Sequence, residues 1–92
     1  MTNVKMSQFG STLTDREDGK RAALSILERT PPPVQLDFAG VVALGSSFGE
    51  EVVRSIAKNQ NDTVAIVNAS NVVRNSLYRI AEGTSIHLSF EV

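Results

Sequence analysis

VQLDFAGVVALGSSFGEEVVRSIAKNQNDTVAIVN, residues 34–68, is the stretch that decides the fold. Val34–Phe38 alternates apolar and polar side chains, which is typical of a strand. Apolar residues then recur at helical spacing over 47–58. The β-branched, apolar segment Thr63–Val67 is typical of a central strand that is buried on both faces. Strand, helix and strand in this order predict a right-handed crossover between two parallel strands.

The segments on either side extend this pattern. Residues 4–6 alternate with polar neighbours and predict a short first strand, and a helix follows until the prolines at 31–33 end it. After the central unit, residues 68–71 offer caps for a third helix with the apolar stripe Val73, Leu77, Ile80 and Ala81, and Gly83 is its predicted stop. Ile86–Val92 alternate strictly, as in a half-buried strand. We therefore expect a single α/β domain over residues 1–92, with a sheet of four to five strands and about three helices.

Two helix starts carry the capping-box pattern, a hydroxyl followed three residues later by a carboxylate. The pairs are Thr14 with Glu17 and Ser47 with Glu50. In such a box each side chain satisfies a backbone N–H that the first helical turn leaves unpaired. Gly19 lies inside the first of these helices, where glycine costs about 1 kcal/mol relative to alanine.

Composition excludes several classes of function. Nine basic and ten acidic residues give a net charge of −1, which provides no general attraction to nucleic acid or to an anionic membrane. The absence of cysteine excludes disulfides, thiolate metal sites and cysteine nucleophiles. His87 is the sole histidine, so a histidine-based triad has no natural partners. The glycines match neither a phosphate-binding loop nor a dinucleotide fingerprint. We expect no cofactor, no bound metal and no enzymatic activity.

The start of the chain lacks the charged-then-apolar architecture of a signal peptide. The longest apolar runs, Val41–Leu44 and Val64–Val67, are too short to cross a bilayer. We therefore expect a soluble cytoplasmic protein that has no membrane partner.

Polar residues follow the predicted parallel strands at the points where the strands end. In an open α/β sheet, ligands gather outside the carboxyl ends of the strands. A helix N-terminus at the same edge adds unpaired N–H groups and a partial positive charge. The residues that we expect to meet there are Asp37, Ser46, Ser47, Asn68, Ser70 and Asn71.

Each of these residues also has a purely structural interpretation. Ser47 is predicted as the N-cap of its helix, a role worth about 1 kcal/mol over alanine. Asp37 is explained by hydrogen bonds to local backbone, and the polar residues after the next strand are typical caps and turn formers. A phosphate on Ser47 would gain from the helix N-terminus but would be repelled by Glu50 and Glu51.

Two segments resemble the STAS-like domain family, a bacterial relative of the anti-sigma-factor antagonists. They are Leu36-Asp37-Phe38-Ala39-Gly40-Val41 and Ser46-Ser47-Phe48-Gly49-Glu50-Glu51. The segment Thr14-Asp15-Arg16-Glu17-Asp18-Gly19-Lys20 also resembles the entry to the first helix of that family. The resemblance runs from about Gly10 to Ile56 and continues more loosely through Asn68–Gly83. It implies a STAS-like mixed sheet.

The resemblance also implies a function. In the antagonists a serine at this turn is phosphorylated by a kinase of the histidine-kinase-like ATPase type, and phosphorylation switches partner binding. Ser46 and Ser47 match the two serines of the antagonist motif, and Ser47 falls on the one usually modified. Gly45, Phe48 and Gly49 stand where the antagonists have aspartate, glycine and leucine. The implied partner-binding set is Ser47, Ser46, Asp37, Phe48, Glu51, Asn68, Ser70 and Asn71.

Three functions follow as hypotheses. The first is a non-enzymatic regulatory module that docks on a kinase or ATPase partner, with serine phosphorylation as an optional control. The alternative is a constitutive structural or assembly module in which the serines only cap helices. The third, a nucleotide-binding protein that uses Asp37 and the helix end, lacks a base and a phosphate loop. The oligomeric state stays open.

Overall fold

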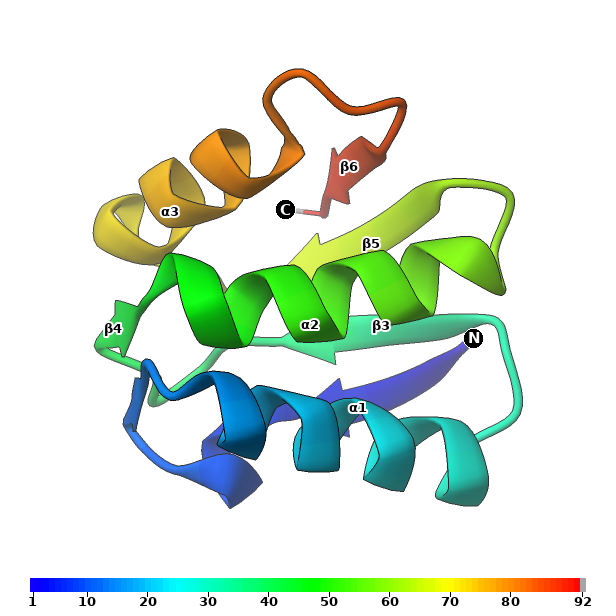
Figure 1. The fold of residues 1–92 in the computed structure, drawn as a ribbon, viewed down its shortest axis with the longest axis horizontal. Coiled ribbons are helices and arrows are strands. Elements are labelled where there is room, and N and C mark those ends of the chain that lie inside the picture. The colour runs from blue at the N-terminus through cyan, green and yellow to red at the C-terminus, as the bar shows by residue number, and fades with distance from the viewer. Residues whose placement is uncertain (92) are drawn as a thin grey trace.

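The structure is a computed structural model, and it describes residues 1–91. Strands and helices alternate along these residues (Figure 1). In chain order the elements are β1 (Thr2–Lys5), the 3-10 helix η1 (Met6–Phe9), β2 (Thr12–Leu13), α1 (Arg16–Arg29), β3 (Val34–Asp37), β4 (Ala43–Leu44), α2 (Ser46–Lys58), β5 (Thr63–Val67), α3 (Asn71–Ala81) and β6 (His87–Phe90). The predicted α/β class is confirmed. Val92, the last residue of the predicted final strand, lies outside the described residues.

The main sheet has the strand order β1-β3-β5-β6, and each pair of neighbours is parallel. The mixed sheet that the family resemblance implied is therefore corrected to a parallel one. The physical reason is that a helix follows each of the first three strands of this sheet. The helix returns the chain to the end of the sheet at which that strand began, so the next strand runs in the same direction. Val4, Leu36, Ile66 and Phe90 lie side by side across the sheet.

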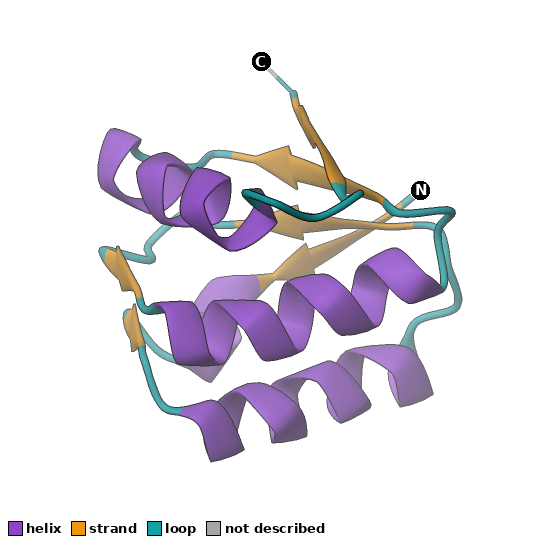
Figure 2. Ribbon diagram, turned by 45° about the horizontal axis from the view of Figure 1, so that its top comes forward, coloured by secondary structure: helices purple, strands orange, loops and turns teal. Residues whose placement is uncertain are grey.

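All three α-helices lie on one face of this sheet (Figure 1 and Figure 2). The strands follow one another in chain order, and right-handed crossovers in a constant direction place every helix on the same side. The central crossover β3–α2–β5 has this predicted hand, as Figure 1 shows. Within residues 1–91 no helix covers the opposite face of the sheet, called here the open face (Figure 2).

The two faces of the main sheet carry different side chains. Buried apolar residues of the central strands point towards the helices: Val34, Leu36, Val64 and Ile66. On the open face the neighbouring row consists of Asn3, Gln35, Ala65 and Ser89. Thr63–Val67 is a central strand, as predicted, and its middle residues Val64, Ala65 and Ile66 are buried whichever face they point to. Thr63 and Val67, at its two ends, are only partly buried.

A second, two-stranded sheet was not predicted. β2 pairs in parallel with β4, with Leu13 opposite Leu44, and the carbonyl of Ser11 accepts a hydrogen bond from the N–H of Val42 at 2.8 Å. Strands of two residues carry no readable alternation, so sequence patterning does not detect them. This small sheet ties the start of α1 to the start of α2.

The helices approach one another closely at two glycines. A Cβ on Gly19 of α1 would lie 2.8 Å from the carbonyl oxygen of Phe48 in α2. A Cβ on Gly49 of α2 would lie 2.2 Å from Cδ1 of Ile80 in α3. Gly19, which sequence alone shows only as a weak point of a helix, thus permits the contact between α1 and α2.

Helix α1 begins one residue later than the predicted capping box. Its N-cap is Asp15, whose carboxylate accepts a hydrogen bond from the N–H of Asp18 at 2.9 Å. Thr14 packs against Gly45 instead, and Glu17 contacts Lys20. The Thr14–Glu17 box is therefore wrong. No helix within residues 1–91 is long and apolar enough to span a membrane.

Candidate functional site

Asp37 is the centre of a hydrogen-bonded cluster at the carboxyl end of the sheet. Asn3 Nδ2 donates to Asp37 Oδ2 at 2.9 Å, and Asn68 Nδ2 donates to Asp37 Oδ1, also at 2.9 Å. The backbone N–H of Ala39 donates to the same Oδ1 at 3.0 Å. The cluster therefore joins β1, the end of β3 and the turn after β5 through one carboxylate.

The environment of Asp37 favours its charged form. Hydrogen bonds from Asn3, then Asn68, then the Ala39 N–H hold the pKa of Asp37 below its ordinary value, and the charge of Lys5 adds to this. Only 9% of Asp37 is exposed. A buried carboxylate whose two oxygens are already bonded is suited to organising the strand ends. It has little capacity left to act as a base or as a ligand.

Asn68 and Ser70 hold the turn between β5 and α3. Asn68 has a positive φ of 57°, a conformation in which asparagine is enriched, and this turns its side chain back to Asp37. Ser70 is the N-cap of α3, and its Oγ accepts a hydrogen bond from the N–H of Val73 at 3.2 Å. Asn71 is the first residue of α3 and is exposed. The structure thus gives Ser70 the predicted capping role.

The start of α2 differs from the prediction. Gly45 is the N-cap, α2 begins at Ser46, and no side chain caps the helix. The Ser47 cap and the box between Ser47 and Glu50 are therefore wrong. The physical reason lies in the small sheet: the N–H of Gly45 is bonded to the carbonyl of Leu13, which places Gly45 where the helix starts. Ser46 is exposed, while Ser47 is partly buried.

Gly45, the N-cap of α2, sits in a confined place. A Cβ there would lie 3.1 Å from Cα and 3.2 Å from Cγ2 of Thr14. These distances are shorter than ordinary van der Waals contact, so Thr14 would have to shift to admit any side chain.

The other two predicted residues of α2, Phe48 and Glu51, differ in accessibility. Phe48 is 1% exposed and belongs to the core, so its side chain is not offered to a partner. Glu51 accepts a hydrogen bond from Arg16 at 2.6 Å, and Glu50 lies 3.2 Å from the same guanidinium. The bonds to Glu51 and then to Glu50 raise the pKa of Arg16 above its ordinary value.

Arg16 changes the electrostatics that the sequence suggested for the serine turn. Glu50 and Glu51 were expected to repel a phosphate at this helix start. In the folded chain the cation of Arg16, brought in from α1, lies against both carboxylates and offsets their charge. The sequence carries no direct signal for this contact, because Arg16 is more than thirty residues away from both acids.

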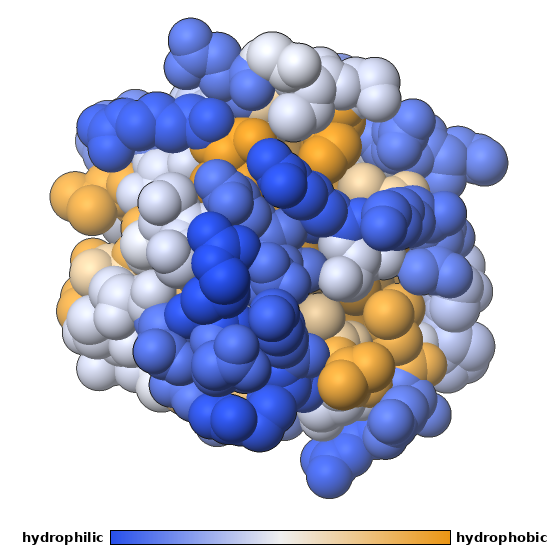
Figure 3. Space-filling view, viewed as in Figure 1, coloured by the Kyte–Doolittle hydropathy of each residue, from blue (hydrophilic) through white to orange (hydrophobic). Residues whose placement is uncertain are grey.

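The sequence also gave no indication of two exposed valines near the serine turn. Val42 is 64% exposed and Val72 is 60% exposed. Val42 immediately precedes β4, and Val72 lies in the first turn of α3, which packs against β4. Figure 3 shows hydrophobic surface at the left edge of the molecule, over β4 and the start of α3.

The predicted site residues therefore separate into two groups. Asp37 and Asn68 bind each other, and within residues 1–91 neither forms a hydrogen bond with Ser46 or Ser47. Ser46 and Asn71 are exposed at the starts of α2 and α3, which pack together. In the described part of the chain, no group of three or more histidine, cysteine, aspartate or glutamate side chains is arranged to hold a metal ion.

No protein-family model, curated protein or solved structure matches this chain. The resemblance to the STAS-like family stays a prediction.

Proposed function

We propose that this protein is a non-enzymatic regulatory module that binds a protein partner through one exposed surface. This surface, called here the edge surface, consists of Val42, Ser46, Asn71 and Val72. One observation carries the proposal: two valines are more than half exposed beside an exposed serine at the start of α2. Aliphatic side chains in this setting are suited to anchor a contact, because full burial of a valine contributes about 1.5–3 kcal/mol.

Phosphorylation of the serine turn would act on such a contact directly. A phosphate brings about −1.5 to −2 charges and a tightly held hydration shell. The N-terminus of α2 tolerates that charge, because its free N–H groups carry partial positive charge. An apolar interface over Val42 and Val72 does not tolerate it, because the phosphate would have to be desolvated. The modification would therefore release the partner without unfolding the module.

The partner that we propose is a serine kinase of the ATPase type, as the family resemblance implies. Ser47 is the position that the resemblance marks as acceptor, whereas Ser46 is the more exposed hydroxyl. Both serines lie in the first turn of α2, directly after β4 and Val42, and α2 packs against α3, which carries Val72.

The test begins with a photoreactive side chain at position 42, used to cross-link the partner in the native host. The partner is then purified and titrated with the parent protein and with the Val42→Ser/Val72→Ser double variant. Leu24→Ser is the matched control, because Leu24 is equally exposed but lies on α1. We expect the double variant to bind at least about tenfold more weakly and the control to bind as the parent does.

The purified partner and the parent protein are also used to test whether phosphorylation controls binding. Incubation with Mg²⁺ and ATP is expected to add one phosphate to the intact mass, and Ser46→Ala and Ser47→Ala identify the acceptor. Equal cross-linking from positions 24 and 42, or unchanged affinity of the double variant, would show that the edge surface is not the contact. If no phosphate is added while binding is unchanged, the protein is a constitutive module without a phosphorylation switch.

A further inference from the structure

The free edge of β1 has the features of a second binding site, away from the edge surface. β1 is the first strand of the sheet order, and in the described part of the chain it pairs with β3 on its inner side and with no other strand. The N–H of Thr2 donates to the carbonyl of Pro33 at 3.2 Å. In a parallel pair the peptide groups alternate in direction, so Thr2 and Val4 face β3 while Asn3 and Lys5 face outward.

These outward groups are unpaired in the described residues. The register with β3 directs the N–H and C=O of Asn3 and the N–H of Lys5 away from that strand, and within residues 1–91 β1 has no second neighbouring strand and these groups form no turn, loop or cap bond. Both residues are exposed. An edge strand with free main-chain donors and acceptors can take up a further strand from another chain.

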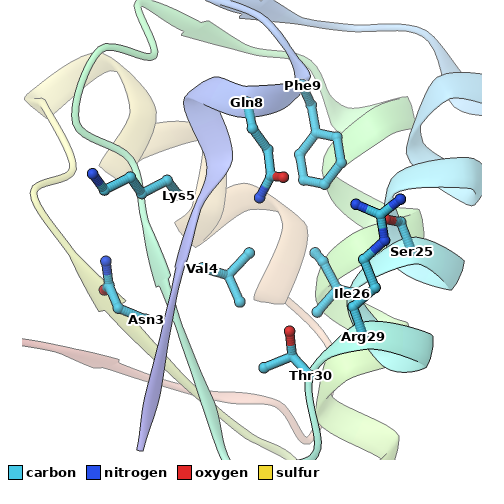
Figure 4. Close-up of a pocket in the computed structure, with 9 residues that line it drawn as sticks. All are labelled: Asn3, Val4, Lys5, Gln8, Phe9, Ser25, Ile26, Arg29 and Thr30. Carbon is cyan, nitrogen blue, oxygen red and sulfur yellow. The ribbon is translucent and has the colours of Figure 1, made fainter.

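A groove runs along this edge between β1 and α1 (Figure 4). Its volume is about 280 Å³. Val4 and Ile26 project into it, and Gln8, Phe9, Arg29 and Thr30 surround it. Asn3 and Lys5 project to the other side of the strand, over the open face. A strand added beside β1 would alternate in the same way, with one row of side chains over Val4 and Ile26 and the other beside Asn3 and Lys5.

The opposite edge of the sheet, at β6, is packed differently. There the guanidinium of Arg74 lies 4.6 Å from the centre of the Phe90 ring, and the Tyr78 ring lies 5.2 Å from it. These α3 side chains pack against Phe90 at the end of β6. A hollow of about 230 Å³ lies before the start of β6, but it is lined by Ser85, Ile86 and residues of α2 and by no residue of β6, whereas the groove beside β1 is lined by β1 itself.

The charges beside the groove define the occupant. Lys5 lies on the open-face side, and Arg29 lies on the helix side in the last turn of α1. Neither forms an ion pair within residues 1–91, whereas the other three basic residues of α1 do. A strand added beside β1 would therefore lie between two cations that form no ion pair, and this favours an acidic ligand.

We propose that the free edge of β1 binds an extended acidic segment of a partner protein as an added strand. Main-chain bonds to Asn3 and Lys5 hold the segment. Its apolar side chains enter the groove over Val4 and Ile26, and its carboxylates face Lys5 and Arg29. This site is independent of the edge surface, since none of its residues belongs to that surface.

The probe is a short fluorescein-labelled peptide in which valine and aspartate alternate, followed by fluorescence anisotropy. A second peptide carries lysine in place of aspartate, and a third carries N-methylated backbone amides. We expect the first peptide to bind and the other two to bind at least about tenfold more weakly. Binding of the first peptide should weaken as NaCl is raised.

Lys5→Pro tests the main-chain contact. Lys5 has a φ of −77°, within the range that proline adopts, and its N–H points away from β3. The substitution therefore removes an outward donor and leaves the β1–β3 ladder intact. Lys5→Gln is the matched control, because it removes the charge and keeps the N–H. We expect Lys5→Gln and Arg29→Gln each to weaken binding by a few-fold and Lys5→Pro to weaken it by about tenfold or more.

Amide hydrogen exchange on the parent protein gives a readout that does not depend on variants. In the free protein the Asn3 and Lys5 amides should exchange faster than that of Val4, and the peptide should slow these two amides specifically. Unchanged exchange at Asn3 and Lys5, or full binding by Lys5→Pro, would overturn the proposal. Protection of these amides by concentration-dependent self-association without peptide would assign the edge to a second copy of the chain.

The two proposals can fail separately. Val42→Ser/Val72→Ser should bind the acidic peptide as the parent does, because both valines lie outside the groove. Loss of peptide binding in that double variant would contradict the independence of the two sites. Lys5→Pro, in turn, should leave the titration with the cross-linked partner unchanged.

Discussion

Asp37 shows how a single side chain can organise the end of a parallel sheet. Successive parallel strands leave their last peptide groups and side chains at one edge, where no ladder continues. Asp37 collects donors from Asn3 of β1 and from Asn68 after β5, and also the N–H of Ala39. Its role at the residue scale is to fix three chain segments relative to one another.

We expect Asp37→Asn to lower the free energy of unfolding by about 1–2 kcal/mol at pH 7. An asparagine amide would present N–H groups to the donor of Asn3, so one bond is lost. Because the folded pKa of Asp37 is lowered, its contribution is present above the unfolded pKa of about 4 and is lost as pH falls through the folded pKa.

Urea unfolding of the parent and of Asp37→Asn at pH 7 and near pH 3 measures this effect. The difference in unfolding free energy between the two proteins should be largest at pH 7 and should shrink in acid. A difference of equal size at both pH values would mean that the charge of Asp37 contributes nothing to stability.

At the scale of single elements, the starts of α3 and α2 are determined in different ways, the first by neighbouring residues and the second by a contact between distant segments. The Ser70 cap of α3 follows from local sequence, because its Oγ reaches the N–H of Val73 three residues on. The start of α2 does not, because pairing of Leu13 with Leu44 places Gly45 at the N-cap. The same residue type, serine before an apolar helix, therefore has different roles in α2 and α3.

This difference predicts opposite outcomes for two alanine substitutions. Ser70→Ala should cost about 1 kcal/mol of unfolding free energy, because it leaves the N–H of Val73 without its partner. Ser47→Ala should be neutral or stabilising by a few tenths of a kcal/mol, since alanine is the better helix former and no cap is lost. Chemical denaturation of both variants measures the pair, and a loss at Ser47 as large as that at Ser70 would contradict the observed helix start.

At the scale of the whole molecule, the helix layer depends on two close approaches. Gly19 faces backbone atoms of Phe48, whereas Gly49 faces the flexible end of the Ile80 side chain. Backbone cannot move without shifting α2 itself, while Ile80 can change rotamer. The contact between α1 and α2 is therefore the more rigid of the two.

We expect Gly19→Ala to destabilise the protein by about 1–3 kcal/mol, even though alanine gains about 1 kcal/mol in helix propensity. Gly49→Ala is the matched comparison and should cost less, because only a side-chain terminus has to move. Thermal and urea unfolding rank the two variants. The reverse order would show that Ile80 is held more tightly than the backbone of Phe48.

The local patterns of this chain determined the order and type of its main elements. Alternation and helical spacing depend on neighbouring residues, so Val34–Phe38 and Ile86–Val92 were predicted as strands and residues 47–58 as a helix. The candidate residues at the carboxyl edge followed from the same order, and Asp37 and Asn68 do meet there.

Tertiary structure decided which of those residues share a surface. The exposure of Val42 and Val72, the contact of Arg16 with Glu50 and Glu51, and the packing of Thr14 against Gly45 all join segments distant in the chain. The open face and the free edge of β1 follow from the strand order, which local periodicity does not encode. Around the serine turn that joins β4 to α2, the sequence therefore supplied the residue types, and the long-range packing set their accessibility and charge.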